Sequence, residues 1–69
     1  MRRYYVFVKD VVLSGYETQE EAEKEKERVE TEIPQWKGQV EVLPREHPKI
    51  QQYARTHPAF RQREGIRVG

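Results

Sequence analysis

Apolar side chains are scarce in this chain, and their positions constrain the fold more than any other feature of the sequence. Hydrophobic residues make up 35% of the 69 residues and charged residues 36%. A chain of this length buries only about 60% of its unfolded surface, so we expect one domain with a thin core. We expect that core to contain Tyr4, Val6, Val8, Val12, Leu13, Val29, Ile33, Trp36, Val40, Val42, Ile50, Tyr53 and Phe60.

The sequence contains no cysteine, which excludes disulfide bonds and zinc sites built on thiolates. Small domains without such supports often gain stability by self-association, so a homodimer is one expectation. The missing cysteine also agrees with a reducing compartment, and we expect a cytoplasmic protein. Lys9 and Asp10 end the first apolar run too early for a signal peptide or a membrane span, so no membrane association is expected.

Residues 3–9 alternate as a β-strand does, which places Tyr4, Val6 and Val8 on one face and Tyr5, Phe7 and Lys9 on the other. Residues 11–16 then predict a second strand, joined through Lys9-Asp10 as a hairpin turn, although no glycine supplies the positive φ that tight hairpins favour. The alternative is one long strand that ends at Leu13. It would make the start of the chain a βαβ unit instead of a ββα unit.

A helix is predicted from Thr18 to about Glu32. Thr18 and Glu21 form a capping box, in which the hydroxyl accepts from the Glu21 N–H and the carboxylate reaches back to the Thr18 N–H. Pro34 forces the preceding residue into extended geometry and so ends the helix. Its apolar stripe is narrow and consists of Ala22, Val29 and Ile33, with the stem of Lys26 in the gap.

Residues 39–43 predict a third strand with Val40 and Val42 pointing inward, ended by Pro44. Beyond it, His47-Pro48 recurs as His57-Pro58. Because proline suits the first helical position, we expect short helices at residues 48–55 and 58–63, the second ended by Gly65.

These elements predict an α+β fold: a small antiparallel ββαβ sheet with one main helix packed on it and a short helical C-terminal extension. Residues 1–44 are expected to form the compact core, and residues 45–69 a basic, partly helical extension of the same single domain. The segment from Gly15 to Ala22 is similar to the strand-to-helix joint of several small sheet-plus-helix families. These include the arm-binding modules of tyrosine-type integrases and RNA/DNA-hybrid-binding domains. The similarity implies a strand followed by a capped helix, and no functional residue is transferred from it.

Residues typical of catalytic and metal sites are few. His47 and His57 fit no zinc-ligand spacing, and Ser14 lacks the flanking pattern of a nucleophile elbow. The glutamates between Glu20 and Glu32 alternate with lysine as on a solvated helix face and do not follow a calcium-loop spacing. We therefore expect no enzyme activity, no cofactor, no metal and no small-molecule substrate.

Charge is sorted along the chain. Residues 17–32 hold eight acids and three bases, whereas residues 45–69 hold six bases and two acids. Arginine favours planar, bidentate partners such as phosphates and carboxylates. The candidates for contact with nucleic acid or another anion are Arg2, Arg3, Arg55, Arg61, Arg63 and Arg67, and the candidates for base stacking are Tyr5 and Tyr53.

The rings of Tyr5 and Phe7 fit either of two roles, which are stacking on a nucleobase and packing in the hydrophobic core. They share the strand face opposite Tyr4 and Val6, which offers stacking if it is exposed and core packing if the C-terminal helices cover it. Core packing is favoured because so small a domain needs these rings for stability.

These patterns predict a small non-enzymatic binding module that contacts nucleic acid through its arginine-rich C-terminal segment. The alternative is a protein-binding or self-associating module that uses the acidic helix, the basic tail against an acidic protein surface, or an exposed edge strand.

Overall fold

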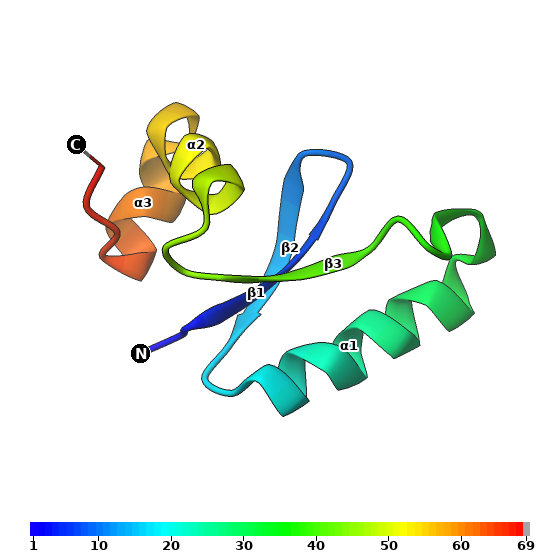
Figure 1. Ribbon diagram of the computed structural model, residues 1–69. Coiled ribbons are helices and arrows are strands. Elements are labelled where there is room, and N and C mark those ends of the chain that lie inside the picture. The colour runs from blue at the N-terminus through cyan, green and yellow to red at the C-terminus, as the bar shows by residue number, and fades with distance from the viewer. Residues whose placement is uncertain (69) are drawn as a thin grey trace.

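The computed structural model describes residues 1–68 and shows an α+β fold. Three antiparallel strands form one sheet in the order β2-β1-β3. The elements in chain order are β1 (Tyr4–Val8), β2 (Val11–Tyr16), α1 (Gln19–Glu32), the 3-10 helix η1 (Pro34–Trp36), β3 (Glu41–Pro44), α2 (Pro48–Thr56) and α3 (Pro58–Glu64). Helix α1 lies along one side of the sheet, and α2 and α3 lie on the other (Figure 1).

The hairpin is confirmed, and its turn adopts positive φ angles without a glycine. Lys9 and Asp10 have φ angles of 50° and 65°, the positive values that a type I′ turn requires at both central positions. Val6 pairs with Ser14 and Phe7 with Val12, so Leu13 is an extra residue in a β-bulge. Leu13 was expected in the core, but the bulge turns it outward and leaves it 40% exposed.

Helix α1 begins and ends where the local sequence signals predict. Thr18 Oγ1 accepts a hydrogen bond from the Glu21 N–H at 3.2 Å, but it is this hydroxyl, not the Thr18 N–H, that donates to the Glu21 carboxylate, at 2.9 Å. Ala22 and Val29 are buried against Val6, Val8 and Val40, which forms the core on this face. The exposed side of the helix carries ion pairs such as Lys24 with Glu20 at 3.8 Å and Arg28 with Glu25 and Glu32.

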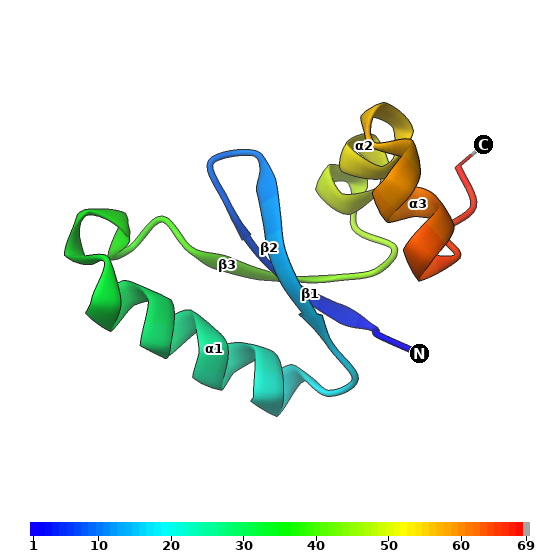
Figure 2. The same cartoon turned by 180° about the vertical axis from the view of Figure 1, so that it is seen from behind.

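The second face of the sheet is covered by the C-terminal helices. Their buried side chains form one cluster with those of the sheet: Tyr5, Phe7, Leu43, Ile50, Ala54, Phe60 and Ile66. The segment expected as an extension therefore forms a third layer of the fold, as the reverse view shows (Figure 2). Covering by these helices decides the role of Tyr5 and Phe7, which are 1% and 5% exposed.

Proline starts both C-terminal helices, and their boundaries match the prediction closely. His47 caps α2, and its Nδ1 accepts from the Lys49 N–H at 3.1 Å. His57 makes no capping hydrogen bond through its side chain, and its ring stacks on Tyr53. Strand β3 covers residues 41–44, where the sequence predicted 39–43; Val40 is buried just before the strand begins.

Candidate functional site

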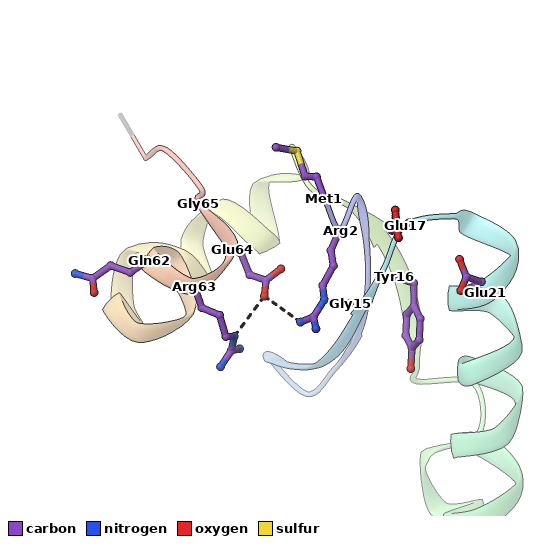
Figure 3. Close-up of a pocket in the computed structure, with 10 residues that line it drawn as sticks. All are labelled: Met1, Arg2, Gly15, Tyr16, Glu17, Glu21, Gln62, Arg63, Glu64 and Gly65. Atoms are coloured by element: carbon purple, nitrogen blue, oxygen red, sulfur yellow. Dashed lines mark hydrogen bonds and ion pairs between the residues drawn. The ribbon is translucent and has the colours of Figure 1, made fainter.

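The N-terminal segment and the end of α3 meet around the carboxylate of Glu64. Arg2 Nη1 lies 3.1 Å and Arg63 Nε 3.3 Å from Glu64 Oε2, and Figure 3 shows both ion pairs converging on one oxygen. The Glu64 side chain is only 5% exposed, whereas those of Arg2 and Arg63 are 53% and 65% exposed. The structure thus brings together two of the predicted arginines from opposite ends of the sequence.

Backbone geometry fixes both sides of this cluster. Gly65 ends α3 in the left-handed conformation, with φ of 65°, and its N–H donates to the Gln62 carbonyl while the Ile66 N–H donates to the Arg61 carbonyl. This is a Schellman cap, and the Ile66 that follows it is buried in the core. On the other side, the Arg3 N–H donates to the Tyr16 carbonyl at 2.8 Å, which holds the N-terminal segment beside β2.

A third arginine, Arg45, which was not among the predicted site residues, completes the cluster. Arg45 Nη1 donates to the Tyr5 hydroxyl at 3.0 Å and to the Arg2 carbonyl at 3.1 Å, and Nη2 donates to the Glu64 carbonyl. The Tyr5 hydroxyl in turn donates to Glu64 Oε1 at 3.1 Å. Burial raises the pKa of Tyr5 to about 12, the Glu64 charge and hydrogen bond add to the rise, and Arg45 opposes it.

The cluster carries more positive than negative charge, because Arg2 and Arg63 pair with the single carboxylate of Glu64 while the Arg45 guanidinium contacts the Glu64 backbone carbonyl. We call these four residues the arginine cluster. One buried carboxylate cannot neutralise three guanidinium groups, so the surface around Arg2 and Arg63 attracts anions.

The groove beside the arginine cluster is mixed in charge. It has a volume of about 680 Å³ and runs between Arg2 and Arg63 on one side and Glu17 and Glu21 on the other. Figure 3 shows these two glutamates toward α1, away from the Glu64 ion pairs. An anion is therefore expected to bind on the outer, arginine side of the groove and not in its interior.

The remaining predicted arginines occupy separate positions. Arg3 is exposed at the start of β1, Arg61 is half-buried on α3, and Arg67 is exposed after α3. Within residues 1–68, no ion pair or side-chain hydrogen bond is formed by Arg3, Arg61 or Arg67. Arg55 lies in the last turn of α2.

The two stacking candidates differ in exposure. Tyr5 is buried, and its ring meets Phe60 edge to face with centroids 5.5 Å apart, so its ring is not accessible to a base and the prediction that it stacks is wrong. Tyr53 is half-buried on α2 and lines a second cleft beside the hairpin turn. Its ring and that of His57 are nearly parallel, with centroids 3.8 Å apart.

In the part of the chain that the structure describes, no group of three or more histidine, aspartate or glutamate side chains is placed to hold a metal ion. No helix formed by residues 1–68 has both the length and the apolar character needed to cross a membrane. Comparison with known proteins finds no matching family model, no matching curated protein and no matching solved structure.

Proposed function

We propose that this protein is a small binding module, without catalytic activity, that holds nucleic acid through its phosphate backbone. The observation that carries the proposal is the excess of guanidinium groups in the arginine cluster, where Arg2 and Arg63 share Glu64 and stay more than half exposed. Arginine pairs with phosphate oxygens in a bidentate geometry, and release of condensed counterions makes such binding favourable.

The arrangement of charge supports an oriented complex. Residues 17–32 carry eight acids against three bases, and the helix they form lies on the opposite face of the sheet from α2 and α3. A polyanion that approaches the basic layer is therefore repelled by the acidic one, which limits the ways in which it can bind. The proposal includes a cytoplasmic location, which the absence of cysteine favours.

A polarisation titration with labelled single-stranded and duplex oligonucleotides at several salt concentrations tests the proposal. Each neutralised phosphate of a single strand contributes about −0.7 to the log–log salt slope, so three to five contacts predict a slope of about −2 to −3.5. Arg3→Gln and Arg67→Gln should each weaken binding and make the slope shallower by about 0.7, because each removes one phosphate contact. Neither substitution breaks an ion pair or a side-chain hydrogen bond among residues 1–68, so the loss of affinity can be assigned to that contact.

Lys24→Gln is the matched control, since it removes one positive charge from the exposed side of α1. It should leave binding unchanged. Absence of binding at micromolar protein in low salt would contradict the proposal. Equal or tighter binding of polyglutamate would instead assign the surface to acidic proteins.

Self-association is the second candidate function, and the exposure of β2 favours it. Val11 and Leu13 are 45% and 40% exposed on this edge strand, which pairs only with β1 among the described residues. An exposed apolar edge is a template for pairing with a second copy of the chain. Light scattering over a concentration series should then show a dimer that Leu13→Lys abolishes, whereas a constant monomer mass would exclude this function.

A further inference from the structure

A second cleft lies between the hairpin turn and α2, on the same side of the sheet as the C-terminal helices. Both views show the turn and α2 rising from the sheet in the same direction (Figures 1 and 2). The cleft has a volume of about 480 Å³, which is within the range of small-molecule sites. The residues that line this hairpin cleft include Phe7, Asp10, Lys49, Gln52, Tyr53 and His57.

Aromatic rings provide a stacking surface in this cleft. Tyr53 is held by an edge-to-face contact with Phe60 at 5.1 Å, whereas Phe7, which also lines the cleft, is 5% exposed and has the Lys49 ammonium 5.9 Å from its ring centroid. The His57 ring stacks on that of Tyr53, with 3.8 Å between the centroids and 11° between the planes, so it covers one face of Tyr53 and, being exposed, presents its own outer face to a ligand. Planar heteroaromatic rings bind to such surfaces through their faces.

Hydrogen bonding fixes the His57 ring in one orientation. His57 Nδ1 lies 2.9 Å from the Tyr53 carbonyl oxygen, which can only accept, so in the neutral ring the proton belongs on Nδ1. Nε2 is then a hydrogen-bond acceptor. The orientation is set by the protein itself, which lowers the entropic cost of stacking a ligand on this ring.

The charged and polar groups of the cleft favour a base over a phosphate. Lys49 is paired with both carboxylate oxygens of Glu41 at 3.1 Å, so it leaves little positive charge for a phosphate. Asp10 repels anions and, like the Gln52 amide, makes no side-chain hydrogen bond within residues 1–68. Carboxylate and amide groups in proteins recognise the exocyclic amino groups of cytosine and adenine.

We propose that the hairpin cleft binds a single unstacked nucleobase that carries an exocyclic amino group. The base would stack on the outer face of the His57 ring, which Tyr53 supports from behind, while its amino group donates to Asp10 or Gln52. This inference rests on the proposed function, because it names the part of a single-stranded nucleic acid that enters the cleft once the arginines hold the backbone.

The first test compares adenine and thymine homo-oligonucleotides of equal length at one salt concentration. Adenine strands should bind more tightly by about fivefold or more, because thymine has no amino group to donate. Asp10→Gly, which suits the positive φ of the turn but removes the carboxylate, and Gln52→Ala should each reduce this preference and leave the salt slope unchanged. Gln19→Ala, which alters an exposed glutamine on α1 that lines neither the groove nor the cleft, is the control and should preserve both. Equal affinity for the two strands would overturn the base site while leaving the backbone site intact.

A second measurement separates the two proposals. Titration of the whole protein with adenosine or thymidine, which carry no phosphate, should shift the NMR signals of Phe7, Gln52 and His57 with adenosine far more than with thymidine. Shifts without oligonucleotide binding would support the cleft and contradict the proposed function. Absence of shifts at these residues at millimolar adenosine would overturn the cleft site.

Discussion

The hydroxyl of Tyr5, in the middle strand of the sheet, donates a hydrogen bond to Oε1 of Glu64 in the last turn of α3, at 3.1 Å. The contact joins residues 59 positions apart, and the Tyr5 ring meets Phe60 of the same helix edge to face. Glu64 thus has two roles. It ties the third layer to the sheet, and it partly neutralises the arginines of the candidate site.

Glu64→Gln should separate these two roles. The amide keeps the shape but loses the charge that binds Arg2 and Arg63, so we expect the free energy of unfolding to fall by about 1–3 kcal/mol. Removal of a carboxylate from the arginine cluster should at the same time tighten binding of a single-stranded oligonucleotide. Urea denaturation and polarisation measure the two effects. Glu46→Gln is the control: it removes the other acid of residues 45–69, which is exposed, and should change the free energy of unfolding little. Weaker oligonucleotide binding by Glu64→Gln would argue against a phosphate site at the arginine cluster.

Tyr5 should lose its phenolic proton only at high pH. Its pKa is raised to about 12, so the folded protein keeps this proton over a pH range in which the unfolded chain has already lost it. The stability that Tyr5 contributes is therefore complete below pH 10 and declines as the pH rises from about 10 to 12. Phenolate absorbance should show one late step that is absent from Tyr5→Phe. A wild-type titration identical to that of the variant would contradict the raised pKa.

Local signals made much of the fold predictable. Thr18 and Glu21 marked the start of α1, Pro34 its end, and Pro48 and Pro58 the starts of the last two helices. Each signal acts within a few residues of itself, which is why sequence reasoning could place it.

Contacts between distant residues were harder to predict. The alternation of apolar residues in the strand places Tyr5 and Phe7 on one face of the sheet, but it does not indicate what covers that face. The cover is formed by Ile50, Phe60 and Ile66, which are distant from the strand in the sequence. The bulge at Leu13 follows from pairing between two strands and has no signature in the strand itself. The site was missed in part for the same reason, since Arg45 and Glu64 acquire their roles only when α3 meets the N-terminal segment.

Gly15 should tolerate no side chain. A Cβ at this position would lie 2.8 Å from Tyr5 Cε1 and 2.9 Å from Arg2 Cδ, and Tyr5 cannot move because it is packed in the core. We expect Gly15→Ala to destabilise the protein by about 1–3 kcal/mol through overpacking. Gly38→Ala is the comparison: its φ of 84° costs about 1 kcal/mol in backbone strain, but no atom lies within 4 Å of the added Cβ. Thermal unfolding should rank Gly15→Ala as the less stable variant, and the reverse order would contradict the packing around Tyr5.

Phe60→Ala should show that the third layer is part of the folding unit. Phe60 is 5% exposed and contacts both Tyr5 and Tyr53, so truncation removes ring contacts on both sides and leaves a cavity. Such substitutions cost about 3–5 kcal/mol, which approaches the whole stability of a domain of this size. Leu13→Ala removes a large apolar side chain from an exposed position and should cost far less.

If circular dichroism showed that Phe60→Ala loses only α2 and α3 while the sheet and α1 melt as before, residues 1–44 would fold by themselves. If all elements melt together at a lower temperature, the sheet needs the C-terminal helices because Tyr5, Phe7 and Leu43 have no other cover.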